Sequence, residues 1–302
     1  MTTPLSQDQL AAFAAVVEAG SFTRAARAIH LSQPALSRRI AGLEDQLAVT
    51  LLVRGPAGPV LTDAGKRVLA FVQAQRALED ELLGDLTSST RALRGEIRVF
   101  GPSSIVPAMI VPPLAALVRE HPAIQLELRS AGNEALAGLL ARGAADFIVT
   151  DEATDDPGVI STAVGHEEHV MIESLAGGPA DVYLDSHVAD RTTAWFLAEQ
   201  PARARPRRWR RSFMHNEAGI LLGVELGLGR AVKPRQTIPP GSPVRVLREF
   251  RPVRKPFYLR HRSQRFYSRL HHIAVGLLVT AIRDGLAASL SPRSSPSAHR
   301  GR

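Results

Sequence analysis

The chain contains no cysteine, few aromatic residues and almost no lysine. The absence of cysteine excludes thiol chemistry and cysteine-ligated zinc. Aromatic residues make up 5% of 302 residues against 45% hydrophobic residues, so Leu, Val and Ala must fill most of the cores. No apolar run approaches the roughly 18 residues that span a bilayer, and the N-terminus lacks a signal-peptide pattern. We therefore expect a cytoplasmic protein of two or three domains with no membrane partner.

Motifs for catalysis are also missing. The sequence has no glycine-rich phosphate loop ending in Lys-Ser/Thr and no GxSxG nucleophile elbow. His166 and His169 flank two glutamates, but no third ligand accompanies them, and we predict a surface loop there. His271 and His272 are predicted to be structural. We expect no enzyme activity, no catalytic residue, no metal and no cofactor.

The net charge of +8 is unevenly distributed. Residues 1–90 contain 8 Lys/Arg and 9 Asp/Glu, so the surplus lies in the rest of the chain. Two arginine-rich runs stand out, residues 203–211 and 245–269. A basic surface for an anionic partner, a solvated arginine face and a coding bias all remain open as explanations.

The first 30 residues predict two short helices. Apolar residues spaced by three or four between Ser6 and Ala19 indicate a helix with one buried face, which Gly20 ends. Ser21 caps a second helix, whose adjacent alanines allow the close approach of a helix-turn-helix. The helix-turn-helix is expected at about residues 22–41.

A third helix opens at Ser32 and has the character of a DNA-recognition helix. Ser32 is a suitable N-cap, and proline is tolerated in the first turn because its missing N–H is not needed there. Glutamine and arginine on the outer face can bind adenine and guanine edges, whereas serines suit phosphates. A simple solvated face is the alternative. The predicted DNA contacts are Ser32, Gln33, Pro34, Ser37, Arg38 and Arg39.

Two short apolar strands follow, around a Gly/Pro-rich turn at residues 55–59. Arg54, at the start of this hairpin, is placed to reach a phosphate or the minor groove, or is a surface arginine without a role. The hairpin completes a winged helix-turn-helix.

The N-terminal sequence resembles the DNA-binding region of LysR-type transcriptional regulators. The resemblance rests on LxxFxxVVExGSFTRAA, SQPALSRRIxxLEDQL, LLVRG and LTDAG, in this order between residues 5 and 62. It implies a dimerising linker helix, a two-lobed effector domain resembling periplasmic binding proteins, and control of a promoter by a small molecule.

A long helix is predicted from Asp63, capped by Thr62. Residues with 4-3-4-3 spacing form a coiled-coil seam, which predicts a homodimer able to associate into a tetramer. The seam residues assigned to dimerisation are Val68, Phe71, Gln75, Leu78 and Leu82. A hinge is expected at residues 87–90.

Residues 91–290 predict an α/β effector domain. Strand, helix, strand, helix and strand alternate from Gly95 to Thr150, as in a parallel sheet covered by helices. Further strands are expected near residues 170–172, 182–184, 244–247 and 257–260, with a final helix at 268–282. Residues 291–302 are predicted to be disordered.

The effector site is predicted at the carboxyl ends of the first three strands, where ligands bind in such sheets. Ser103 and Ser104 follow the first strand and open a helix, Asn133 follows the second strand, and Thr150 follows the third. Hydroxyl and N–H groups there suit a small anionic effector, although Ser103 and Ser104 also suit plain helix capping.

Together, these features predict a sequence-specific regulator of double-stranded DNA. The fold class expected is an N-terminal all-α winged helix-turn-helix with a long linker helix, followed by a two-lobed α/β domain. The predicted domains are residues 5–62, 63–90 and 91–290. A sequence-nonspecific architectural DNA-binding protein with a basic C-terminal surface is the alternative.

Overall fold

The computed structural model describes residues 4–55, 58–87 and 93–290. The chain divides into two compact units that are each built from segments distant in sequence. The first unit contains Met1–Pro102, Ile110–Thr162 and Leu259–Val279. The second unit contains Ser103–Met109, Ala163–Tyr258 and Thr280–Arg302. The predicted disordered tail and residues 88–90 of the predicted hinge lie outside the described residues.

Three helices open the first unit: α1 (Gln7–Ala19), α2 (Phe22–Ala28) and α3 (Gln33–Leu47). Ser21 and Ser32 each accept a backbone N–H from the first turn of their helix, which satisfies a donor that the turn leaves free. Gly20 ends α1 in the left-handed conformation. Ala25 and Ala26 are buried in a cluster with side chains of α1 and α3, so the three helices pack closely, as predicted.

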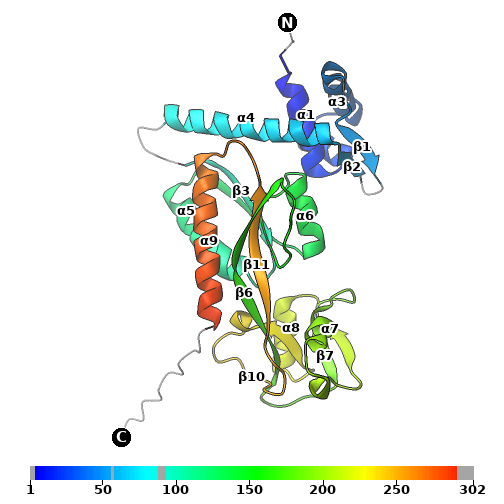
Figure 1. Ribbon diagram of the computed structural model, residues 1–302, viewed down its shortest axis with the longest axis vertical. Coiled ribbons are helices and arrows are strands. Elements are labelled where there is room, and N and C mark those ends of the chain that lie inside the picture. The colour runs from blue at the N-terminus through cyan, green and yellow to red at the C-terminus, as the bar shows by residue number, and fades with distance from the viewer. Residues whose placement is uncertain (1–3, 56–57, 88–92, 291–302) are drawn as a thin grey trace. The chain divides into compact units, whose positions relative to one another are not determined.

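A two-stranded wing and a long helix follow. Strands β1 (Leu52–Gly55) and β2 (Gly58–Leu61) pair antiparallel. Helix α4 (Asp63–Thr87) is capped by Thr62, whose hydroxyl oxygen accepts the Gly65 N–H at 3.0 Å. Figure 1 shows α4 as one continuous helix. Its first half buries Leu69 and Val72 against the α1 core.

The rest of the first unit contains a parallel sheet. Strand β3 (Gly95–Gly101) lies between β4 (Ile124–Ser130) and β5 (Phe147–Thr150) and pairs parallel with both. Helix α6 (Asn133–Ala141) packs against β3 and β5, and its Leu136 and Leu140 are buried with Phe100 and Ile148. Helix α5 (Val111–Glu120) packs on β4.

The helix predicted between the first two strands of this sheet is divided into two parts. A π-helix covers Val106–Ile110, and α5 begins only at Val111. Pro112 and Pro113 cause the division, because proline cannot donate a helical hydrogen bond and is tolerated only in a first turn.

The second unit contains an antiparallel sheet and a separate parallel pair. Strand β6 (Val159–Ser174) pairs antiparallel with β9 (Ala231–Pro234) and β10 (Val244–Val246). Strands β7 (Val182–Asp185) and β8 (Arg210–Phe213) pair parallel; β8 was not predicted. Helices α7 (Thr192–Ala198) and α8 (Glu217–Glu225) contribute to two apolar clusters. Strand β11 (Val253–Arg262), like β6, begins in one unit and ends in the other.

Helix α9 (Arg269–Leu290) closes the described chain. By length and composition it is long and apolar enough to cross a membrane, although polar residues interrupt it and it contains no continuous apolar run of about 18 residues. Its buried residues recur every four positions, which is typical of a helix packed on a protein core. They are Leu270, Ala274, Leu278, Ile282 and Leu286.

The surface loop predicted at residues 166–169 is wrong. These residues lie within β6, and Glu167, Glu168 and His169 are buried. The polar sequence concealed the strand because each buried group has a polar partner. Glu168 pairs with Arg235 at 2.6 Å, and Glu167 lies 3.3 Å from His169. Among the described residues, no group of three or more candidate ligands is placed to hold a metal ion.

Candidate DNA interface and effector site

The predicted DNA-binding face lies on one side of α3. Leu36, Ile40 and Leu43 are buried on the opposite side. Ser32, Gln33, Pro34 and Arg38 are exposed, and Ser37 is half-buried. The Ser32 hydroxyl accepts the Ala35 N–H at 3.3 Å, and the Ser32 carbonyl oxygen accepts the Leu36 N–H at 3.0 Å, which fixes the start of the helix. Pro34 has no N–H, so the exposed face offers mainly side-chain donors.

Arg39 differs from its neighbour Arg38. The Arg39 guanidinium forms an ion pair with Asp8 of α1 at 3.3 Å. The ion pair links α3 to α1, so the Arg39 guanidinium is less free than that of Arg38 to hydrogen-bond the edge of a base. The side chain of Arg54 lies outside the described structure, although its backbone is part of β1.

The Glu44 carboxylate, which was not predicted to have a role, links α3 to the wing. Glu44 accepts the backbone N–H groups of Leu51 at 2.6 Å and Leu52 at 3.2 Å. These contacts fix the start of β1 relative to the recognition helix. The sequence carries little signal for this role, because Glu44 is indistinguishable from any other acidic residue near the end of a helix.

Helix α4 presents apolar side chains to solvent beyond its packed first turns. Phe71, Leu78 and Leu82 are each half or more exposed, at 50%, 50% and 57%. Val68 is partly buried against the α1 core, and Gln75 donates to Glu79 at 2.9 Å. The predicted seam thus has an exposed apolar part and one residue that already packs within its own chain.

Two of the predicted effector residues come together in the first unit. The Thr150 hydroxyl donates to the Asn133 side-chain oxygen at 3.2 Å, and the Asn133 amide donates to Asp151. Thr150 is buried, and Asn133 begins α6. Their positions at the carboxyl ends of β5 and β4 match the prediction.

The other two lie in the turn after β3, and they differ in environment. Ser103 is exposed, whereas Ser104 is buried and hydrogen-bonds the carboxyl group of Glu167. The Gln236 amide donates to the same carboxyl group. Burial raises the pKa of Glu167 to about 7, against the lowering effect of these two hydrogen bonds. Sequence reasoning missed Glu167 and Gln236 because β6 was not recognised there.

The fold and these sites define a DNA-binding transcriptional regulator with a separate α/β domain for a ligand. Residues 7–66 match the family model described as "Bacterial regulatory helix-turn-helix protein, lysR family". Residues 90–289 match the model of the "LysR substrate binding domain". The chain belongs to the LysR family of transcriptional regulators, as its sequence motifs predicted.

Individual relatives agree with this assignment. The chain is 30% identical over 254 residues to the probable HTH-type transcriptional regulator LrrA of Synechococcus elongatus, covering 78% of this chain and 83% of LrrA. It is 32% identical over 174 residues to the nitrogen assimilation regulatory protein nac of Escherichia coli, covering 56% of this chain and 57% of nac.

Solved structures share the fold. ArgP from Mycobacterium tuberculosis has a TM-score of 0.70 at 23% identity, covering 92% of this chain and 98% of ArgP. Full-length LysG from Corynebacterium glutamicum, with the bound effector Arg, has a TM-score of 0.68 at 22% identity, covering 93% of this chain and 99% of LysG. The predicted fold class, a winged helix-turn-helix followed by a two-lobed α/β domain, is confirmed.

Proposed function

We propose that this LysR-family regulator reads its operator through the exposed face of α3, with Gln33 and Arg38 at base edges. Both side chains are exposed near the start of a capped helix, and that observation carries the proposal. In a helix-turn-helix the N-terminal part of the second helix enters the major groove. Ser32 and Ser37 are assigned to phosphates, and Pro34 shapes the first turn.

Arg39 and Arg54 are assigned to the DNA backbone. The ion pair with Asp8 holds the Arg39 guanidinium close to α1, which suits a phosphate better than a base edge. Arg54 lies in the wing, a position from which a side chain reaches a phosphate or the minor groove. Phosphate contacts fix register and orientation, while base contacts provide sequence discrimination.

Dimerisation is assigned to α4. The exposed Phe71, Leu78 and Leu82 recur at intervals of seven and four, which is the spacing of a coiled-coil seam. A second copy of α4 would remove this apolar surface from water. Val68 and Gln75 flank the same face. LysR regulators oligomerise and bind DNA and small effectors; for this chain we propose a homodimer.

We assign the effector site to Ser103, Ser104, Asn133 and Thr150, and we narrow the chemistry of its ligand. Ser104 contacts the carboxyl group of Glu167, and the side-chain oxygen of Gln236 is buried without a hydrogen-bond partner in the described structure. The Glu167 carboxyl group and the Gln236 oxygen are thus two acceptors in the surroundings of Ser104. An effector that presents an N–H or O–H donor to this group fits better than the anion that was expected from the sequence.

We propose the domain limits that the sequence predicts. Residues 5–62 would form the DNA-binding domain, residues 63–90 the linker and residues 91–290 the effector domain. Relatives of this chain are transcriptional regulators, and we propose regulation without enzyme activity, in the cytoplasm.

A gel-shift titration tests the DNA assignment. Arg38→Ala should weaken binding to the DNA upstream of the chain's own coding region by about tenfold to a hundredfold, the range for a lost bidentate base contact. Binding to unrelated DNA should fall much less. Arg119→Ala, which removes an exposed arginine near the end of α5, is the matched control and should bind normally. Unchanged specific binding by Arg38→Ala would refute the assignment of α3.

A further inference from the structure

A mostly apolar cavity lies within the first unit. Its volume is about 590 Å³, which is within the range of about 300 to 1,000 Å³ typical of small-molecule sites. Its walls come from the wing, α4, α6 and the start of β6. The apolar side chains that line it are Val17, Leu52, Pro59, Val60, Leu61, Leu69, Ala70, Ala137, Leu140, Ala141, Ile148 and Val159.

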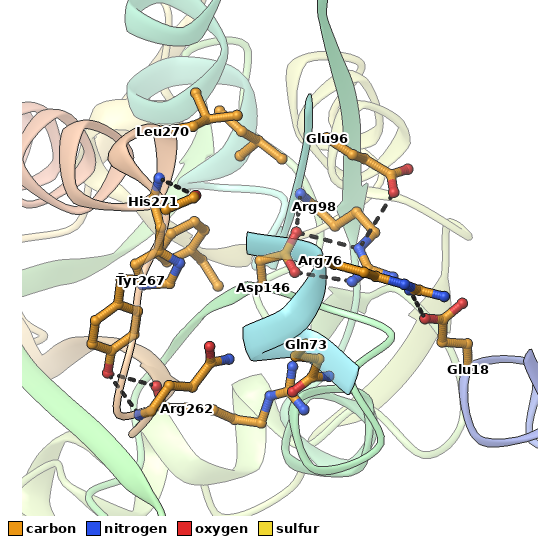
Figure 2. Close-up of a pocket in the computed structure, with 14 residues that line it drawn as sticks. Glu18, Gln73, Arg76, Glu96, Arg98, Asp146, Arg262, Tyr267, Leu270 and His271 are labelled. Carbon is orange, nitrogen blue, oxygen red and sulfur yellow. Dashed lines mark hydrogen bonds and ion pairs between the residues drawn. The ribbon is translucent and has the colours of Figure 1, made fainter. Parts of the chain in front are cut away.

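One end of the cavity is polar and contains a half-buried arginine, Arg262. This residue ends β11 and also lines a neighbouring hollow of about 240 Å³ (Figure 2). Burial lowers the pKa of Arg262 to about 10. Within the described structure its guanidinium has no hydrogen-bond or ion-pair partner. Its nitrogen atoms are not among the fully buried polar atoms that lack a partner, so water or an acceptor can reach the guanidinium.

Neighbouring acids act on this cation through charge alone, because Asp146 and Glu18 raise the pKa of Arg262 without forming an ion pair with it. Asp146 is engaged by Arg98 through contacts of 2.9 and 3.3 Å, as Figure 2 shows. Arg142 also lines the cavity, and its pKa is lowered by burial and by the proximity of Arg24. The cavity is lined by one acid, Asp156, and by four cations, so positive charge exceeds negative charge there; the cations are Lys66, Arg142, Arg260 and Arg262.

Helix α4 contributes a further polar side chain, Gln73, to the polar end of the cavity. Gln73 of α4 lies beside Arg262 in Figure 2. A Cβ atom added to Gly143 would lie 2.6 Å from the Gln73 amide nitrogen and 3.2 and 3.3 Å from the Arg262 guanidinium nitrogens. The Gln73 amide and the Arg262 guanidinium thus lie close to Gly143, whose lack of a side chain leaves room for both groups. The Gln73 side-chain oxygen is buried without a hydrogen-bond partner in the described part of the chain.

We propose that this cavity is a second ligand site, separate from the predicted effector residues, and that it binds a small amphipathic carboxylate. The carboxylate would accept from Arg262 and from the Gln73 amide, and its apolar body would lie against Leu69, Leu140 and Ile148. Charge-assisted contacts to arginine are the strong ones available to a carboxylate. The apolar walls disfavour a small, fully hydrated anion such as phosphate, because they offer it no further hydrogen bonds.

Occupancy would act on the DNA-binding domain directly. The wing residues Leu52 and Val60 and the linker residue Gln73 line the same cavity as α6. A bound acid would therefore join the wing and α4 to the effector domain. This effect requires no occupant at Ser103 or Ser104.

Calorimetry with octanoate and the full-length protein tests the proposal. We expect saturable binding of one octanoate per chain, and binding about tenfold weaker or worse for the neutral octanamide and for the variant Arg262→Met. Arg262→Met should fold, because it replaces a half-buried charge that has no ion pair in the described structure with an apolar side chain of similar length. Arg265→Met, at an exposed arginine outside the cavity, should bind octanoate normally.

A second variant tests whether binding needs the apolar space of the cavity, independently of the Arg262 charge. Ala141→Phe fills space at the end of α6 without removing a cation and should also abolish octanoate binding, whereas Ser104→Ala should not affect it. The proposal is overturned if octanoate fails to bind at millimolar concentrations, or if Arg262→Met binds it as well as the wild type. Loss of binding in Ser104→Ala alone would place the acid at the effector residues and would equally overturn the proposal.

Discussion

Replacing the buried Glu167 with glutamine should remove a pH-dependent weakness of the second unit. The Glu167 carboxyl lies in β6, in contact with the Ser104 hydroxyl and the Gln236 amide, and its pKa is raised to about 7 mainly by burial. Glutamine is close in shape and retains an acceptor for these partners. It cannot ionise, so it avoids the cost of a buried charge at high pH.

The sign and the magnitude follow from linkage. The folded chain binds the proton of the Glu167 carboxyl group more tightly than the unfolded chain does. The stability that this proton contributes is therefore fully present below the ordinary pKa of 4.5 and is lost as the pH rises through about 7. At about 1.4 kcal/mol per pH unit, the interval between these values corresponds to about 3 kcal/mol. The wild type should therefore lose about that much stability between pH 4.5 and 8, relative to Glu167→Gln.

Tryptophan fluorescence reports on the appropriate unit. The chain has two tryptophans, Trp195 and Trp209, and both pack against the same apolar cluster of the second unit. Urea unfolding followed by their emission should give equal stabilities for wild type and Glu167→Gln near pH 5, and a more stable variant at pH 8. Glu199→Gln, at an exposed site in the same unit, is the control and should follow the wild type. The reasoning would be refuted if the stability of Glu167→Gln fell between pH 5 and pH 8 as much as that of the wild type.

Two further predictions concern the N-terminal region. Glu44→Ala should speed hydrogen exchange of the amides at the start of β1 by about thirtyfold, because about 2 kcal/mol of charge-assisted hydrogen bonding is lost. Asp45→Ala, which alters the adjacent exposed acid, should leave that exchange unchanged, and equal rates in both variants would contradict the role of Glu44. Leu78→Glu should convert the dimer to a monomer in sedimentation at micromolar concentration, because it places a charge in the seam of α4. Val188→Glu, at an exposed apolar residue of the second unit, should remain dimeric; a dimeric Leu78→Glu would refute the seam.

The N-terminal fold was predictable because its signals are local. Ser21 and Ser32 cap the helices that follow them, and Gly20 ends α1, as their residue types indicate. The parallel order of β3, β4 and β5 followed from alternating strand and helix patterns. These features depend on residues within a few positions of one another, and local sequence carries that information well.

The parts that were missed depend on distant partners. Glu167 and Glu168 are buried in a strand because Gln236 and Arg235, about seventy residues away, satisfy them. The apparent excess of arginine has a similar explanation in several cases. Arg211, for example, binds Asp185 and the backbone carbonyl oxygens of His187 and Val188.

The positions of the effector residues were only partly predictable. Asn133 and Thr150 were expected near each other at the carboxyl ends of β4 and β5, and they are hydrogen-bonded. Ser104 was expected at the effector site, with helix capping as the alternative, and its hydroxyl contacts Glu167. Only the folded chain brings that carboxyl group to the turn after β3, so sequence patterns could not reveal this contact.

Footprinting over a salt series, on the DNA upstream of the chain's own coding region, tests the central claim most directly. A dimeric reader built on α3 should protect two half-sites about one helical turn, or a multiple of it, apart. It should also bind that site about a thousandfold or more tightly than unrelated DNA at physiological salt. Sequence-specific recognition by this chain would be contradicted by uniform protection along the DNA. It would also be contradicted if every DNA sequence bound with the same affinity and that affinity fell equally steeply with salt concentration.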